Sequence, residues 1–118
     1  MSSRSDRELL VDMLEAISRA QIYTDRVEYQ DFIADIKTQD AVIRALEILG
    51  EASKGVSLPI KSSFPDLPWK NMAGLRDKLI HDYFGVNLDI VWEVATDKMS
   101  ELSMQIKQIL AQLDIEYE

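Results

Sequence analysis

Hydrophobic residues recur every three or four positions over long stretches of this chain, which is the spacing of one face of an α-helix. Residues 5–24 show this pattern, and Ser5 followed three residues later by Glu8 predicts a capping box at its start. Residues 38–56 are apolar around so much of a helical circumference that we expect a central helix there. A shorter apolar stretch at 28–35 predicts a brief helix docked on the core.

Turn-forming residues mark the start of the second half of the chain. Residues 55–68 hold all three prolines together with three serines and a glycine, and this composition predicts a loop. Pro68 suits the first turn of a following helix, which we expect over 68–84. Asn87 can cap a last helix over 88–113, whose apolar residues form a narrow seam typical of packing in a bundle.

No segment alternates with the two-residue period of a β-strand. We therefore predict an all-α protein, a single domain over 1–118 built as an up-down bundle of four main helices plus a short one. The tail from residue 114 onward is expected to fray.

Two glycines lie inside the expected helices, where each costs about 1 kcal/mol relative to alanine. We expect the two helices to cross near Gly50 and Gly74, since such glycines often mark a close approach. The alternative is that either glycine is merely tolerated. A crossing there would place Glu47 and Glu51 near Arg76.

Composition removes most classes of site. The chain has no cysteine and one histidine, so neither a disulfide nor a credible zinc site is expected, and no cofactor motif is present. No stretch of about 18 apolar residues predicts a membrane span, and the N-terminus does not resemble a signal peptide. The expectation is a soluble cytoplasmic protein.

The net charge of -8 argues against nucleic-acid binding over the whole surface, but the charge is uneven. Residues 52–81 hold five basic residues against two acidic ones, while the rest of the chain is strongly acidic. This local excess makes an RNA-binding segment plausible, although chance clustering in a loop gives the same pattern. The candidate RNA-binding residues are Lys54, Lys70 and Lys78.

The basic segment also holds the most reactive group of side chains, at residues 74–83. It contains Arg76, Asp77, the only histidine, His81, and Tyr83. An imidazole can take up and release a proton near neutral pH, and an arginine can hold a phosphate and neutralise charge in a transition state. This set of groups suits metal-free RNA cleavage, in which a 2′-hydroxyl attacks the neighbouring phosphate.

Such chemistry ordinarily uses two proton carriers, and this chain offers one histidine. A two-fold homodimer would bring two copies of His81 and Arg76 to one seam, so the chemistry predicts a composite site at a dimer interface. The alternative is that His81 is only a hydrogen-bonding residue at the surface.

Three stretches resemble the HEPN-domain family, specifically the HepT-like toxins of MntA–HepT toxin–antitoxin modules. Arg76, His81 and Tyr83 match its Arg-x4-His-x-Tyr signature, residues 44–54 resemble its second helix, and 68–76 resemble the lead-in to its catalytic helix. The resemblance implies a homodimeric, metal-independent endoribonuclease with Arg76 and His81 as catalytic residues. It also implies a partner, an MntA-like nucleotidyltransferase antitoxin that silences the toxin by transferring AMP to the tyrosine matched by Tyr83.

Asp77 departs from the family pattern, in which this position is often asparagine. An aspartate there would raise the basicity of the histidine and repel a phosphate. Two other interpretations therefore stay open: a non-catalytic HEPN-like dimer that binds a nucleotidyltransferase, nucleotide or RNA, and a purely structural helical dimer.

Overall fold

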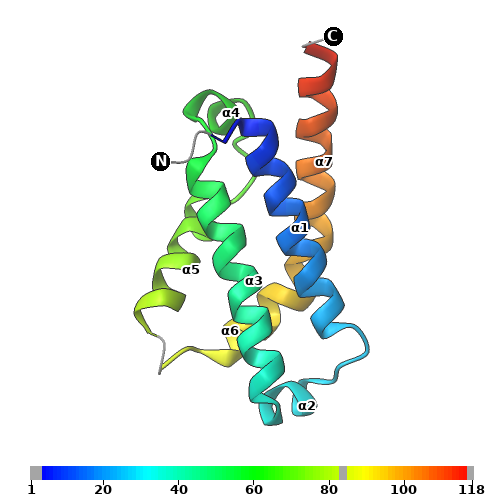
Figure 1. Cartoon of the computed structure of the whole chain (residues 1–118), viewed down its shortest axis with the longest axis vertical. Coiled ribbons are helices and arrows are strands. Elements are labelled where there is room, and N and C mark those ends of the chain that lie inside the picture. Colours follow the sequence, from blue (N-terminus) through cyan, green and yellow to red (C-terminus); the bar gives the residue numbers. More distant parts are fainter. Residues whose placement is uncertain (1–3, 83–84, 117–118) are drawn as a thin grey trace.

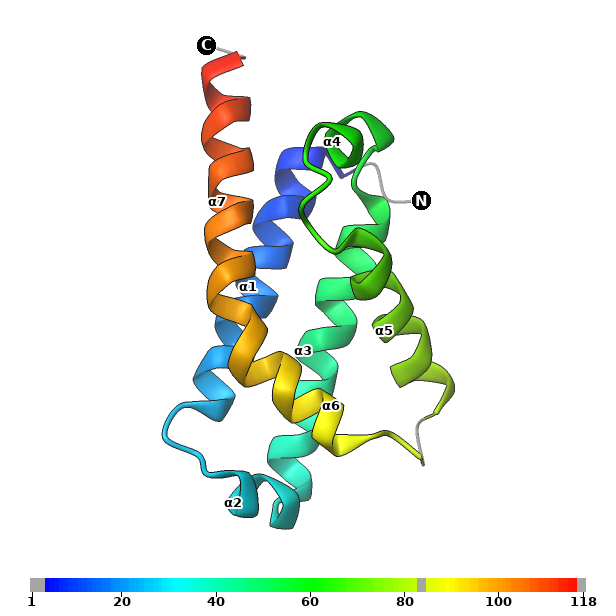
Figure 2. The same cartoon turned by 180° about the vertical axis from the view of Figure 1, so that it is seen from behind.

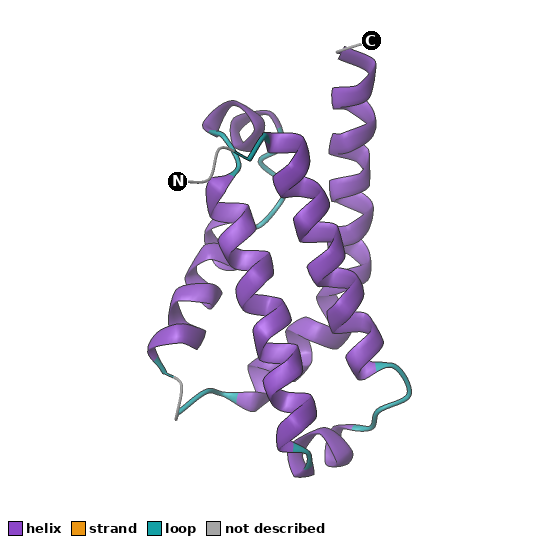
Figure 3. Cartoon of the chain, in the orientation of Figure 1, coloured by secondary structure: helices purple, strands orange, loops and turns teal. Residues whose placement is uncertain are grey.

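The computed structural model describes residues 4–82 and 85–116, with side chains up to residue 114, and every regular element in these ranges is a helix (Figure 3). This confirms the all-α prediction. In chain order the elements are α1 (Asp6–Thr24), α2 (Tyr29–Ala34), α3 (Ile36–Gly55), α4 (Leu58–Ser63), α5 (Trp69–His81), α6 (Leu88–Glu93), the π-helical turn η1 (Val94–Lys98) and α7 (Met99–Glu116). Within these ranges no helix is long and apolar enough to cross a membrane.

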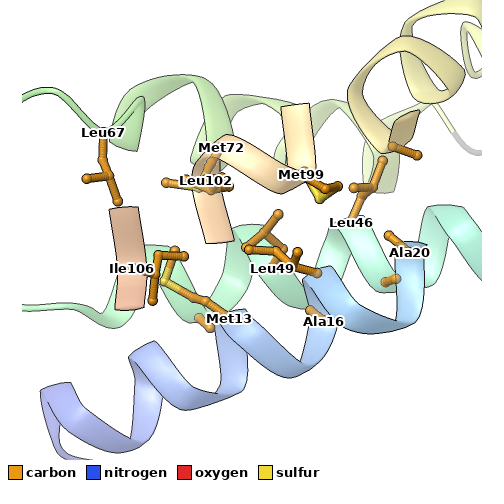
Figure 4. Packing of buried hydrophobic residues seen from close by; sticks show 14 of the residues in the cluster. Met13, Ala16, Ala20, Leu46, Leu49, Leu67, Met72, Met99, Leu102 and Ile106 are labelled. Atoms are coloured by element: carbon orange, nitrogen blue, oxygen red, sulfur yellow. The ribbon is translucent and has the colours of Figure 1, made fainter. Parts of the chain in front are cut away.

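Helix α3 lies between α1 and α5, which confirms that the second long helix is central (Figure 1). Seen from behind, α6, η1 and α7 cross the opposite side, and α7 packs along α1 (Figure 2). The core forms where these helices face one another, with Met13 and Ala16 of α1, Leu46 and Leu49 of α3, and Met99 among its side chains (Figure 4). Each fully buried side chain of this size contributes about 1.5–3 kcal/mol to folding.

Local capping signals fix the helix ends. The Ser5 hydroxyl accepts a bond from the Glu8 amide at 3.1 Å and the Glu8 carboxylate accepts one from the Ser5 amide, so the predicted capping box is confirmed. The Asn87 side chain likewise accepts bonds from the first amides of α6. Helix α3 begins at Ile36, earlier than expected, because Asp35 caps it through the amide of Thr38.

The predicted loop over 55–68 is wrong in part, because α4 lies within it. Ser57 precedes α4, and its amide and hydroxyl donate to the Asp6 carboxylate of α1 at 2.8 and 2.6 Å. Pro59 lies in the first turn of α4, where a missing amide proton costs no helical hydrogen bond. Pro68 is the residue before α5 rather than part of its first turn. Helix α5 ends at His81, with Asp82 as its C-cap, so the predicted end at residue 84 is wrong by three residues.

The predicted last helix is continuous but contains a π-helical turn. Across this turn the buried residues Val91, Ala95 and Met99 are spaced four apart in sequence. A spacing of three residues first occurs between Met99 and Leu102. Trp92 is half-buried and packs against two rings, Tyr29 and Phe32 of α2. Within the tail that was expected to fray, α7 continues to Glu116, and residues 117–118 lie outside the described residues.

Candidate functional site

Helices α3 and α5 approach each other most closely at Gly50. A Cβ atom built at this glycine would lie 2.3 Å from Arg76 Cβ and 2.7 Å from the carbonyl oxygen of Met72. The predicted crossing at Gly50 is therefore confirmed. The same prediction is wrong for Gly74, because a Cβ atom there would have no neighbour within 4 Å.

This crossing fixes the position of Arg76. Its stem lies against Gly50, and its Nε is buried without a hydrogen-bond partner. The two outer nitrogens are each held by a carboxylate: Nη2 lies 2.7 Å from Glu51 of α3, and Nη1 donates to Asp77 at 3.0 Å. The expected proximity of Glu51 and Arg76 is present in the structure.

Asp77 is shared between two cations. The Lys54 ammonium donates to the same Asp77 oxygen, Oδ1, at 3.1 Å. Hydrogen bonds from Arg76 and then Lys54 hold the pKa of the Asp77 carboxyl below its usual value. Asp77 is therefore an anion at neutral pH, and the four side chains of Glu51, Lys54, Arg76 and Asp77 form a cluster with no net charge.

Arg76 and Glu51 lie on the wall of a cavity of about 740 Å³ between α1, α3 and α5. Ile80, one turn beyond Arg76, lies on the same wall, as expected of residues on one helix face. Glu47 also lines this cavity, but its carboxylate pairs with Arg44 at 3.5 Å rather than with Arg76.

Each of the four arginines that line the cavity is paired with a carboxylate of the same lining. The pairs are Arg4 with Asp12, Arg19 with Glu15, Arg44 with Glu47, and Arg76 with Glu51. The wall is therefore densely charged but nearly neutral. This lining was not predicted from the sequence, although the i,i+4 spacing of Glu15 and Arg19 was a visible signal.

His81 is the last residue of α5 and is exposed. No hydrogen bond joins the His81 side chain to the side chain of Arg76 or Asp77. His81 lies five positions after Arg76 in the helix, which places their side chains about 140° apart around the axis and about 7.5 Å apart along it. The Arg76 side chain turns toward Glu51, so one chain does not gather both groups around a single phosphate. Tyr83 lies outside the described residues.

The other candidate RNA-binding lysines lie along α5. Lys70 is exposed in the first turn and forms no ion pair with any described residue. Lys78 is exposed and lies 3.8 Å from Asp82, an ion pair of little energetic weight at a surface. The described residues contain no group of three or more His, Cys, Asp or Glu side chains that could hold a metal ion.

Known proteins are similar to this chain over most or all of its length. The family model described as "Ribonuclease HepT-like" matches residues 13–109. The chain belongs to the HepT-like ribonuclease family. A relative in Thermococcus cleftensis named "Probable ribonuclease HepT" is 42% identical over 106 residues, which cover 90% of this chain and 96% of the relative. A relative in Methanocaldococcus jannaschii whose name describes it as an RNase is 39% identical over 118 residues, which cover 100% of this chain and 98% of the relative.

No solved structure matches this HepT-like chain. The family membership nevertheless gives the geometry of α5 a context. The arginine held at the crossing of α3 and α5 and the histidine at the end of α5 belong to a chain of a ribonuclease family.

Proposed function

We propose that this chain is an endoribonuclease that acts without a metal ion, with Arg76 and His81 as its catalytic residues. The observation that carries the proposal is that a member of a ribonuclease family presents a fixed arginine at a cavity wall, on the same helix as its only histidine. Its charge distribution agrees, because α5 and the residues before it form the one locally basic part of the sequence.

These groups suit an internal transfer at phosphorus. The 2′-hydroxyl of RNA loses its proton to a base and its oxygen forms a bond to the adjacent phosphorus. The bond from phosphorus to the 5′-oxygen of the next nucleotide breaks, and an acid protonates that oxygen. His81 supplies a proton carrier, and Arg76 stabilises the charge that builds on the phosphate oxygens. The products are a 2′,3′-cyclic phosphate and a 5′-hydroxyl.

Both proton transfers need a carrier, and two features support a site shared by two chains. The chain has a single histidine, and the side chains of His81 and Arg76 leave α5 about 140° apart. A two-fold homodimer would supply a second copy of each group at its seam.

A mixing experiment tests the activity and the shared site together. Wild-type chain at a fixed amount is unfolded and refolded with increasing His81→Ala chain, and RNA cleavage is measured. When the chains pair at random, each wild-type chain in an equal mixture has a wild-type partner half of the time. A shared site makes the mixed dimers inactive, so the rate of RNA cleavage should fall to about half. Asn71→Ala chain, altered at an exposed residue on the far side of α5, serves as the control and should not lower the rate. A rate that stays constant as His81→Ala is added contradicts the shared site.

The biological role that we propose is that of the toxin in a toxin–antitoxin module. Its partner is an MntA-like nucleotidyltransferase that transfers AMP from ATP to the phenol oxygen of Tyr83, with release of pyrophosphate. Tyr83 follows His81 by two residues, so the added phosphate and base would lie beside the proton carrier. The new negative charge would repel RNA at that position.

Mass spectrometry of the chain after co-expression with such a nucleotidyltransferase tests this regulation. The peptide with Tyr83 should gain the mass of one or more AMP units, and cleavage by the modified chain should fall below detection. The Tyr83→Phe variant keeps the ring but lacks the acceptor oxygen, so it should remain unmodified and active. An unmodified Tyr83 in cells whose growth the partner has restored contradicts this mechanism.

One observation favours a second function, a HEPN-like dimer that binds RNA or a nucleotidyltransferase without cutting. Both outer nitrogens of Arg76 are already occupied by carboxylates, and Asp77 would repel a phosphate. Partner binding with no cleavage of a diverse RNA pool by the wild-type chain would support this function in place of the first.

A further inference from the structure

The two carboxylates on Arg76 are held with very different strength. Asp77 is adjacent in sequence and is bonded to both Arg76 and Lys54. Glu51 makes one ion pair, to Arg76 Nη2, and its side chain is 60% exposed. Of the two, Glu51 is the carboxylate that can leave Arg76 without breaking a second interaction.

The guanidinium itself has little freedom to move. The Arg76 stem is pressed against Gly50, and Nε is buried without an acceptor. Only the Nη edge is directed toward groups at the cavity wall, and Nη1 is taken by Asp77. An incoming anion can therefore take the place of the Glu51 carboxylate on Nη2 without breaking the hydrogen bond between Nη1 and Asp77.

The proposed function already assigns a phosphate contact to Arg76; we propose in addition that Glu51 occupies the phosphate position on Arg76 Nη2 as a displaceable carboxylate in the unliganded chain. This inference rests on the proposed function, because it takes RNA as the anion. Glu51 thus lowers the affinity for RNA by competing for Arg76, and it is not a catalytic residue. Phosphate replaces one singly charged anion with another, so the guanidinium stays paired throughout.

The cavity supplies a closely matched control in Glu15. Glu15 lines the same cavity, its side chain is 61% exposed, and it pairs with Arg19 at 2.8 Å, compared with 2.7 Å for Glu51 and Arg76. Replacing either glutamate with glutamine removes one negative charge from one exposed ion pair on the same wall. The two variants differ in which arginine is released, so a general change in the field of the cavity affects both.

Binding is measured by fluorescence anisotropy with a 2′-O-methyl oligoribonucleotide of mixed sequence, which lacks the attacking hydroxyl and cannot be cut by this route. At low salt, Glu51→Gln should lower the dissociation constant by about two- to five-fold, the upper part of the range expected when one competing ion pair is removed. Glu15→Gln should change it by less than about two-fold. In an Arg76→Ala background the gain from Glu51→Gln should vanish, because the contested nitrogen is absent.

The outcomes separate this inference from the proposed function. Equal binding by Glu51→Gln and Glu15→Gln, weaker binding by Glu51→Gln, or a gain that survives in Arg76→Ala would overturn the subsite. If the gain appears but no variant cuts unmodified RNA, the subsite stands and the ribonuclease proposal fails. If Arg76→Ala abolishes cleavage while Glu51→Gln binds as the wild type does, the ribonuclease stands and the subsite fails.

Discussion

Replacing His81 with alanine should lower the rate of RNA cleavage by about 10²- to 10⁴-fold, the contribution usual for a positioned acid or base. The stability of the fold should hardly change, because His81 is exposed at the end of α5 and its side chain has no hydrogen bond to any described residue. Arg76→Ala should cost about 10²- to 10³-fold through lost stabilisation of the phosphate charge. The measurement is the initial rate of cleavage of a labelled RNA, with and without EDTA.

Two controls make this result interpretable. Asn71→Ala changes an exposed residue of the same helix and should cleave at close to the wild-type rate. The wild-type chain should cleave equally well with EDTA present, as a reaction carried by Arg76 and His81 requires no metal ion. Wild-type rates in His81→Ala or Arg76→Ala would remove these residues from the chemistry, and loss of wild-type activity in EDTA would contradict a metal-independent reaction.

Gly50→Ala should destabilise the protein by about 1–3 kcal/mol, the usual cost of overpacking a tight contact. The added carbon would meet Arg76 Cβ at 2.3 Å and the Met72 carbonyl oxygen at 2.7 Å, and the second obstacle is backbone that no rotamer change can move. This cost exceeds the gain of about 1 kcal/mol that alanine brings to a helix interior. The midpoint of urea unfolding measures the change. Cleavage should fall as well, because α5 must shift and carry Arg76 with it.

Gly74→Ala is the matched substitution on the facing helix. A Cβ atom there meets nothing within 4 Å, so the helical propensity of alanine should act alone and stabilise the protein by up to about 1 kcal/mol. The two variants should therefore shift the unfolding midpoint in opposite directions. If Gly50→Ala is as stable as Gly74→Ala, the two helices can separate at the crossing without cost.

Local signals in the sequence predicted the elements whose causes are local. The capping box at Ser5 and the broad apolar surface of α3 involve residues within one or two turns of each other, and both are confirmed. Helix α4 was missed because its start is held by Asp6, which lies 51 residues from Ser57 in sequence. The π-helical turn was missed because it shifts the apolar spacing by one residue within an otherwise regular pattern.

In the candidate site, too, a contact that has a local signal in the sequence was predicted and a contact without one was not. Glu51 was expected near Arg76 because Gly50 signalled a crossing, and the two side chains form an ion pair. The pairing of Lys54 with Asp77 was not expected, since it depends on how far the end of α3 extends along α5. Lys54 was predicted to bind RNA and instead holds Asp77 in this structure, so its contact with RNA stays a prediction.

Helix α5 buries only Met72 and Leu79, and it packs chiefly on α3, while a cavity of about 480 Å³ separates it from η1 and α7. An element with so few buried groups opens locally at a lower free energy than the rest of a domain, and its amide protons exchange sooner. Any molecule that binds only the folded form of α5, whether RNA or a second chain, adds stability to this helix by mass action. The order of the helix with the candidate catalytic groups should thus respond to what is bound.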